Sequence, residues 1–81
     1  KRPVRIAVHI GRDRPGLLAE ITTAISSRQG NITKADIIVT EDRKGMNNFV
    51  VEVDDLRQLQ SIIQAIREVR DVINVERVRG L

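Results

Sequence analysis

The sequence contains no cysteine, tryptophan or tyrosine, and it has a single histidine and a single phenylalanine among its 81 residues. Without cysteine the chain cannot form a disulfide or a thiolate metal site, which excludes a metal chaperone of the paired-cysteine type. One histidine cannot assemble a metal cluster by itself. No apolar run approaches the roughly 18 residues of a membrane-spanning helix, and no signal-peptide pattern is present. We therefore expect no metal, no cofactor, no membrane partner and a cytoplasmic location.

The chain is short and weakly basic, with 81 residues and a formal net charge of +3. This charge permits weak attraction to nucleic acid, but acidic residues are interspersed with the basic ones, as on an ordinary solvated surface. A domain of this size buries only roughly 60–65% of its unfolded surface, so pairing with a second subunit would stabilise it. The sequence starts at Lys1 and leads directly into a strand pattern. We expect one domain, residues 1–81, that belongs to a longer protein.

Hydrophobic periodicity predicts both strands and helices along the chain. The predicted strands are residues 4–10, 31–40, 46–53 and 71–78, and the predicted helices are residues 17–29 and 55–69. Gly30 suits a left-handed cap after the first helix, and Asp55 with Gln58 forms a capping box before the second. With right-handed crossovers, the βαββαβ order predicts an α+β ferredoxin-like sandwich. In this fold a four-stranded antiparallel sheet has two helices on one face.

The predicted sheet is apolar on both faces in places, although its own helices cover only one of them. The third strand places Phe49, Val51 and Val53 on the helix side, and the second helix presents an apolar stripe formed by Leu56, Leu59, Ile62, Ile63, Ile66 and Val69. However, residues 37–39 and 49–51 are continuous apolar runs, which places Ile38 and Val50 on the open face. We expect a second copy of the chain to cover this face or to extend the sheet edge. His9 lies on the same face and is expected to be a surface or interface residue.

Two functions known for this fold fit the residues poorly. An acyl-phosphate hydrolase needs a phosphate-binding loop, and residues 11–14 supply arginines, but Asp13 would repel phosphate and Pro15 lacks an amide donor. A solvated loop is the favoured interpretation. An RNA-recognition domain stacks bases on exposed aromatic rings. The run 44–50 resembles such a strand, but Phe49, the single aromatic residue, belongs to the core face. No spacing of residues indicates catalysis, so we expect the chain to be non-catalytic.

The turn at residues 13–18 is the strongest functional candidate. Pro15 has a fixed φ that suits the first turn of a helix, and Gly16 allows another group to approach the free helix amides. These amides and the helix dipole favour an anionic group such as a carboxylate. We expect Asn31, either as a ligand-binding amide or as a simple turn residue, at the same end of the sandwich. The candidate ligand-binding or interface residues are Arg12, Asp13, Arg14, Pro15, Gly16, Leu17, Asn31 and Ile32.

Several segments together resemble the ACT domain, a regulatory module of amino-acid-responsive enzymes. They are Asp13-Arg14-Pro15-Gly16-Leu17-Leu18, Gly30-Asn31-Ile32, and Val72-Ile73-Asn74-Val75-Glu76-Arg77-Val78. The chain is most similar to the C-terminal ACT domain of RelA/SpoT-family (p)ppGpp synthetases and hydrolases, the GTP pyrophosphokinases of the stringent response. Further similarities are the Pro3-Val4 start and the run from Asp55 to Leu59.

This resemblance implies a non-catalytic sensor domain whose parent enzyme has its catalytic residues in other domains. It also implies a homodimer, contacts with other domains of the parent enzyme, and contacts with the ribosome or tRNA. In related ACT domains an amino acid binds at the dimer interface, which here implies contacts from Gly16 with Asn31 opposite. The alternative is an amino-acid-binding ACT domain of an amino-acid biosynthetic enzyme.

Overall fold

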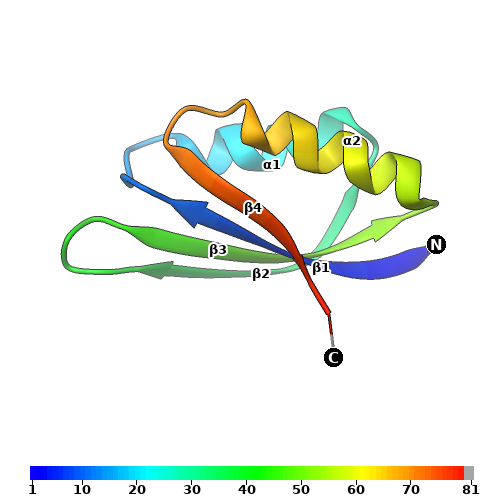
Figure 1. Ribbon diagram of the computed structural model, residues 1–81, viewed down its shortest axis with the longest axis horizontal. Helices are drawn as coiled ribbons and strands as arrows, with labels where there is room; N and C mark the ends of the chain where they lie inside the picture. Colours follow the sequence, from blue (N-terminus) through cyan, green and yellow to red (C-terminus); the bar gives the residue numbers. More distant parts are fainter. Residues whose placement is uncertain (80–81) are drawn as a thin grey trace.

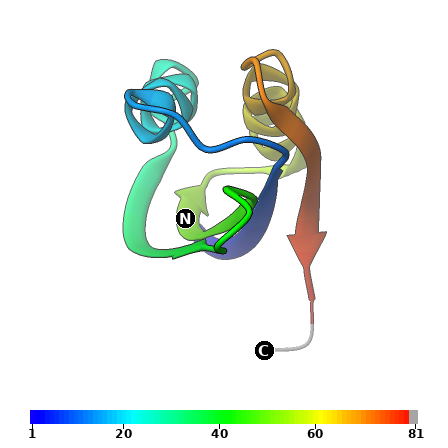
Figure 2. The same ribbon diagram turned by 90° about the vertical axis from the view of Figure 1, so that its left-hand side faces the viewer.

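The computed structural model describes residues 1–79 and confirms the βαββαβ order. The elements are β1 (Arg2–Ile10), α1 (Leu17–Ser27), β2 (Asn31–Val39), β3 (Gly45–Val53), α2 (Leu56–Arg67) and β4 (Val72–Val78). The strands form one antiparallel sheet in the order β2-β3-β1-β4, and both helices lie on the same face of it (Figures 1 and 2). This is the ferredoxin-like sandwich that the sequence predicts.

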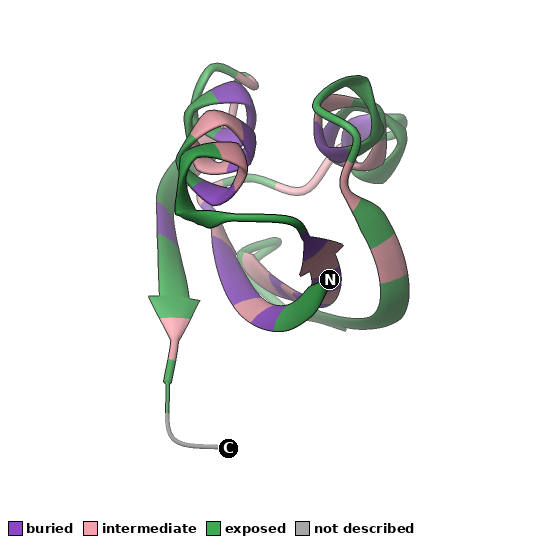
Figure 3. Cartoon of the chain, turned by 90° about the vertical axis from the view of Figure 1, so that its right-hand side faces the viewer, coloured by how far each residue is buried: buried purple, intermediate pink, exposed green. Residues whose placement is uncertain are grey.

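The core lies between the helices and the two central strands. The buried residues of β1 and β3 follow the expected alternation except at Ala7, which is buried on the open face, and those of both helices face the sheet (Figure 3). The residues of this core are Val4, Ile6, Val8, Ile10, Leu17, Ile21, Ile25, Phe49, Val51, Val53, Leu59, Ile62, Ile66 and Val75. Phe49 is fully buried on the helix side, as predicted, so no aromatic ring is available on the open face.

β2 is an edge strand that the helices cover only at its start. Ile32 packs against the core, whereas every later residue of the strand is exposed. Ile37 pairs with Asn47 and Val39 with Gly45, so both side chains lie on the face of the sheet that carries the helices, as the sequence predicts. They are nevertheless exposed, because β2 leaves the end of α1 and curves away below it (Figure 2).

The prediction of a left-handed cap at Gly30 is wrong. Gln29 has the positive φ of 67° instead, and Gly30 donates its amide to the Ile25 carbonyl at 3.1 Å. Glycine is needed at position 30 for a different reason. A Cβ there would lie 2.8 Å from Ile62 Cδ1 and 2.9 Å from Ile25 Cγ2 and Val51 Cγ1. The chain therefore passes between the two layers where only a residue without a side chain fits.

The predicted cap of α2 is confirmed, with one difference from a standard capping box. The Asp55 carboxylate accepts the Gln58 amide at 2.8 Å, but Gln58 Oε1 accepts the amide of Asp54, one residue earlier, at 2.6 Å. Gln58 Nε2 also donates to the Arg28 carbonyl at 3.0 Å and so joins the two helices. Leu56 was predicted to be part of the buried stripe, but it is 60% exposed, because the first turn of α2 extends beyond the apolar core.

Candidate docking and ligand site

Three loops meet at one end of the sandwich and surround the predicted turn. The loop between β1 and α1 contacts the β2–β3 hairpin, because the Asp13 amide donates to the Arg43 carbonyl at 2.7 Å. It also contacts the loop between α2 and β4, because the Gly11 amide donates to the Asp71 carbonyl at 2.9 Å. All three connections lie on the left of Figure 1. The predicted site is therefore held by segments that are far apart in the sequence.

The turn before α1 has the geometry of a type II turn. Gly16 has φ 84° and ψ −8°, and the Leu17 amide donates to the Arg14 carbonyl at 3.2 Å. These dihedral angles are those of the third residue of a type II turn, for which glycine is favoured, and proline is favoured at the second. Gly16 is thus the N-cap of α1, and the prediction that Pro15 lies in the first helical turn is wrong. The turn also uses the Leu17 amide, which reduces the number of free donors.

The surface above Gly16 is open. A Cβ added at this position would meet no atom within 4 Å, so the requirement for glycine comes from the positive φ alone. Leu17, next to it, is 1% exposed and belongs to the core, whereas Leu18 is 43% exposed. A ligand or a second subunit can approach the glycine and Leu18, but it cannot contact the Leu17 side chain.

Arg14 already has partners within the chain. Its Nε donates to Asp71 Oδ2 at 2.8 Å, one terminal nitrogen donates to Glu20 Oε2 at 2.5 Å, and the other donates to the Arg70 carbonyl at 3.1 Å. The hydrogen bond that Arg14 donates to Glu20, and next the one that it donates to Asp71, raise the pKa of Arg14 further above its ordinary range. In return, the Arg14 bond lowers the pKa of Glu20. Arg14 therefore joins the turn to the α2–β4 loop, and a ligand carboxylate would have to displace two carboxylates to reach it.

A cavity of about 380 Å³ lies beside the turn, lined by Arg12, Arg14, Arg70 and Asp71. Arg12 makes no hydrogen bond to any of the residues that the structure describes, and Arg70 is exposed. Asp71 forms ion pairs with both Arg14 and Arg70, the second at 3.8 Å, and the three arginines outnumber this one carboxylate in the lining, so the hollow is positively charged. It can receive an acidic group from a ligand or from another protein surface.

Asn31 lies at the opposite end of the sandwich from the turn, which contradicts the prediction that both share one end. Asn31 pairs with Glu52, and Glu52 pairs with Pro3 at the start of β1. The Asn31 Nδ2 group donates to Glu52 Oε1 at 2.8 Å. β1 and β2 run parallel to each other on either side of β3, so the start of β2 is about 26 Å, the length of a nine-residue strand, from the end of β1. Within one chain, Asn31 and Gly16 cannot contact the same small ligand.

His9, Ile38 and Val50 share the open face of the sheet, as the sequence predicts. His9 and Ile38 both pair with Met46, in one row across the sheet, and Val50 pairs with Arg5 nearer the start of β1. The structure adds a partner that the sequence did not indicate, because His9 Nε2 lies 3.1 Å from Glu76 Oε1 of β4. Ile38 is 52% exposed, whereas Val50 is half-buried. That a second copy covers this face remains a prediction.

The largest run of exposed apolar residues is on the free edge of the sheet. Ile37, Ile38 and Val39 are consecutive in β2 and are 42%, 52% and 50% exposed. β2 has β3 on one side only, so its other side presents unpaired backbone groups. An apolar edge of this kind is typical of a surface that pairs with another strand.

Two further kinds of feature, a metal-binding cluster and a membrane-spanning helix, are absent from the part of the chain that the structure describes. Residues 1–79 contain no group of three side chains that could hold a metal ion. No helix within them is long and apolar enough to cross a membrane.

Comparison with known proteins gives matches along nearly the whole chain. The family model described as ACT domain matches residues 1–77. A GTP pyrophosphokinase of Myxococcus xanthus is 41% identical over 78 residues, which are 96% of this chain and 10% of that protein. The bifunctional (p)ppGpp synthase/hydrolase RelA of Mycobacterium tuberculosis is 33% identical over 66 residues, which are 82% of this chain and 9% of that protein. The chain thus spans about a tenth of the length of these relatives.

Solved structures share the fold. The crystal structure of the ACT domain from GTP pyrophosphokinase of Chlorobium tepidum has a TM-score of 0.80 at 26% identity and covers 94% of this chain and 96% of that one. The small subunit of acetolactate synthase from Thermotoga maritima has a TM-score of 0.83 at 17% identity and covers 100% of this chain and 50% of that one. The second likeness concerns the fold alone.

Proposed function

The chain belongs to the ACT domain family, and from this we propose that it is a non-catalytic regulatory domain of a longer enzyme that synthesises or hydrolyses (p)ppGpp. The observation that supports this is the match to GTP pyrophosphokinases over nearly all of the chain but only about a tenth of theirs. Catalysis would belong to the rest of the parent enzyme. The domain would respond to a partner or ligand and transmit that response to the catalytic part.

The proposed means of assembly is pairing of β2 edges between two copies. Two edge strands related by a two-fold axis pair antiparallel and form one continuous sheet. This arrangement would cover Ile37, Ile38 and Val39 and would satisfy the free backbone groups of the edge. It would also add buried surface to a domain that is small for independent stability.

Such a dimer would explain why Gly16 and Asn31 lie at opposite ends of one chain. In an antiparallel pair, the start of one β2 lies beside the end of the other. The end of β2 leads into the hairpin that contacts the Gly16 turn, through the bond between Asp13 and Arg43. Asn31 of the second copy would therefore lie beside the Gly16 turn of the first. A ligand site that uses both residues would be complete only in the dimer.

Sedimentation equilibrium of single-site variants tests this assembly. Ile38→Lys would place a charge in the pairing edge, whereas Ile73→Lys makes the same change on the opposite edge strand, where Ile73 is 69% exposed. The dimer would bury two Ile38 side chains, each 52% exposed in the single chain, which together equal about one full burial, or about 1.5–3 kcal/mol. We therefore expect Ile38→Lys to weaken the dimer roughly 10–100-fold and Ile73→Lys to leave it unchanged. A wild-type chain that stays monomeric at hundreds of micromolar would disprove the proposal, as would equal effects of the two variants.

Calorimetric titration with the twenty amino acids separates a docking role from a ligand-binding role at the turn. Saturable binding that Gly16→Asp abolishes would favour the alternative function, an amino-acid-binding ACT domain. The absence of binding would favour contacts with other domains, the ribosome or tRNA. A salt-dependent mobility shift with tRNA or ribosomal RNA fragments would support the RNA contact, since phosphate contacts weaken as salt rises.

A further inference from the structure

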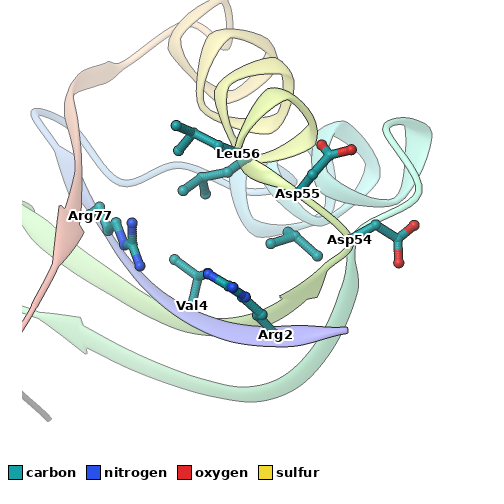
Figure 4. A pocket seen from close by; sticks show the side chains of 8 residues that line it. Arg2, Val4, Asp54, Asp55, Leu56 and Arg77 are labelled. Atoms are coloured by element: carbon teal, nitrogen blue, oxygen red, sulfur yellow. The ribbon is translucent and has the colours of Figure 1, made fainter.

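A second cavity, of about 280 Å³, lies at the end of the sandwich away from the Gly16 turn. It opens between the start of β1, the end of β4 and the first turn of α2 (Figure 4). The side chains of Arg2 and Arg77 lie on the sheet side, and Leu56 lies across from them on the helix (Figure 4). The cavity is thus separate from the site and from the β2 edge described above.

Arg2 and Arg77 occupy positions where the strand pattern calls for apolar residues. Arg2 is two residues before Val4 on β1, and Arg77 is two residues after Val75 on β4, so each continues the helix-facing row of its strand. Arg77 pairs with Ile6, which also faces the helices. Polar residues at core-facing positions oppose folding and are typical of functional sites.

Neither arginine has an acidic partner among residues 1–79. No hydrogen bond or ion pair within this range involves either guanidinium. Two carboxylates lie at the rim of the cavity, but the Asp55 carboxylate caps α2 through the Gln58 amide. The Asp54 carboxylate points away from the cavity (Figure 4). The two guanidinium groups are therefore not paired with the carboxylates of the cavity lining.

The other half of the cavity is apolar. Val4, Val53 and Leu59 form part of its lining and are 5%, 3% and 3% exposed. Leu56 adds a side chain that is 60% exposed, so a bound molecule would cover apolar surface that now faces water. Apolar walls with a few convergent polar groups are the usual composition of small-molecule sites.

We propose that this cavity binds a small organic anion. Its acidic group contacts the guanidinium groups of Arg2 and Arg77, which suit carboxylates and phosphates because each presents several donors in a plane. Its aliphatic part packs against Leu56 and Leu59. An ammonium group beside the acidic group would be repelled by the two arginines, because the Asp55 carboxylate caps α2 and the Asp54 carboxylate points away from the cavity. The expected class is therefore a small aliphatic carboxylate or phosphate monoester without an amino group.

Two-dimensional NMR titration of the 81-residue chain tests this proposal. The probes are 4-methylpentanoate, isobutyl phosphate, 4-methylpentan-1-ol and leucine. We expect saturable shifts at the amides of Val4, Leu56 and Leu59 with one or both acids, and the tighter of the two identifies the acidic group. The alcohol and leucine should each bind at least tenfold more weakly, because one lacks the charge and the other adds an ammonium group.

Variants establish which arginines bind the acid. Arg2→Gln and Arg77→Gln should each weaken binding at least tenfold, whereas Arg57→Gln, on an exposed part of α2 outside the cavity lining, should leave it unchanged. Because all three side chains are exposed, the spectra away from the cavity should show that the variants fold. Absence of saturation at tens of millimolar acid, equal binding of leucine, or equal losses in all three variants would overturn the proposal. None of these results depends on how the chain dimerises.

Discussion

Replacing Gly30 by alanine tests how tightly the helices and the sheet pack where α1 returns to the sheet. The new Cβ would lie 2.8 Å from Ile62 Cδ1 and 2.9 Å from Ile25 Cγ2 and Val51 Cγ1. All three neighbours are 0% exposed, so none has free space to move into. Overpacking of this kind destabilises the folded state by about 1–3 kcal/mol. The replacement of glycine also reduces the conformational freedom of the unfolded chain, which stabilises the fold by about 0.4–1 kcal/mol. We expect a net loss of about 1–2 kcal/mol in the free energy of unfolding.

Urea denaturation followed by far-ultraviolet circular dichroism measures this loss, since the chain has no tryptophan or tyrosine for fluorescence. At this chain length, a loss of about 1–2 kcal/mol lowers the melting temperature by roughly 4–16 °C. The variant Ile62→Val removes the Cδ1 atom that lies closest to the new methyl group. On its own it should cost about 0.5–1.5 kcal/mol, but in the Gly30→Ala background it should cost less.

The double-mutant cycle decides whether the steric reasoning is correct. If the clash with Ile62 causes the loss, the double variant Gly30→Ala/Ile62→Val should be more stable than the sum of the two single effects predicts. The expected difference in the free energy of unfolding is at least about 0.5 kcal/mol. Additive effects would mean that the methyl group is accommodated by another route. A Gly30→Ala variant as stable as the wild type would refute the reasoning, because it would show that the helices and the sheet make room for the methyl group without a loss of free energy of unfolding.

Three further changes test the turn, the helix cap and the ion pairs. The methyl group of Gly16→Ala would contact no atom, so this variant should lose about 1 kcal/mol in the free energy of unfolding through the positive φ alone. Gly16→Asn should lose less, because asparagine tolerates this conformation. Equal decreases of the urea midpoint in the two variants would contradict this reasoning. Asp55→Ala removes the cap of α2 and should lower the free energy of unfolding by about 1 kcal/mol, whereas Asp54→Ala, whose side chain accepts no hydrogen bond from the helix, should have little effect. Arg14 lowers the pKa of Glu20 below its ordinary value of 4.5, so this pair stabilises the fold above that pH and is lost as the pH falls through the lowered pKa. The Glu20→Gln variant should therefore show a smaller decrease in urea midpoint between pH 5 and pH 3 than the wild type, and parallel profiles would exclude a role for the pair.

The fold could be predicted because its signals are local and periodic. The alternation of β1 and β3 and the apolar spacing of α2 each appear within ten or twelve residues, and burial follows them. The cap at Asp55 was predictable for the same reason. The errors arose where a property depends on distant packing. The glycine at position 30 is required by Ile62 and Val51, which are more than 20 residues away, and not by its own dihedral angles.

The candidate site was predicted in part. The Pro15-Gly16 pair correctly indicated a turn at the start of α1. The role of Arg14 could not be predicted, because its partner Asp71 is 57 positions away and reaches it only through the meeting of two loops. Asn31 was placed at the wrong end although the predicted crossover implies the correct one. The helix between two parallel strands begins at the end of the first strand and leads back to the start of the second, which lie at opposite ends of the sheet. The cavity of Arg2 and Arg77 could have been predicted from the sequence, because each arginine continues the alternating apolar row of its strand at a position where an apolar residue is expected.

The two proposed sites should respond differently to the state of assembly. If a ligand at the turn contacts Gly16 of one copy and Asn31 of the other, it binds only the dimer, and binding and dimerisation must strengthen each other to the same extent. Ile38→Lys would then weaken ligand binding at the turn as much as it weakens the dimer, although Ile38 belongs to the pairing edge and not to the turn. The cavity of Arg2 and Arg77 is complete within one chain, so the same variant should bind 4-methylpentanoate as the wild type does. Measuring both affinities in the Ile38→Lys variant therefore separates a site built by assembly from a site built by the fold, and an equal loss at both would show that the substitution had disturbed the domain itself.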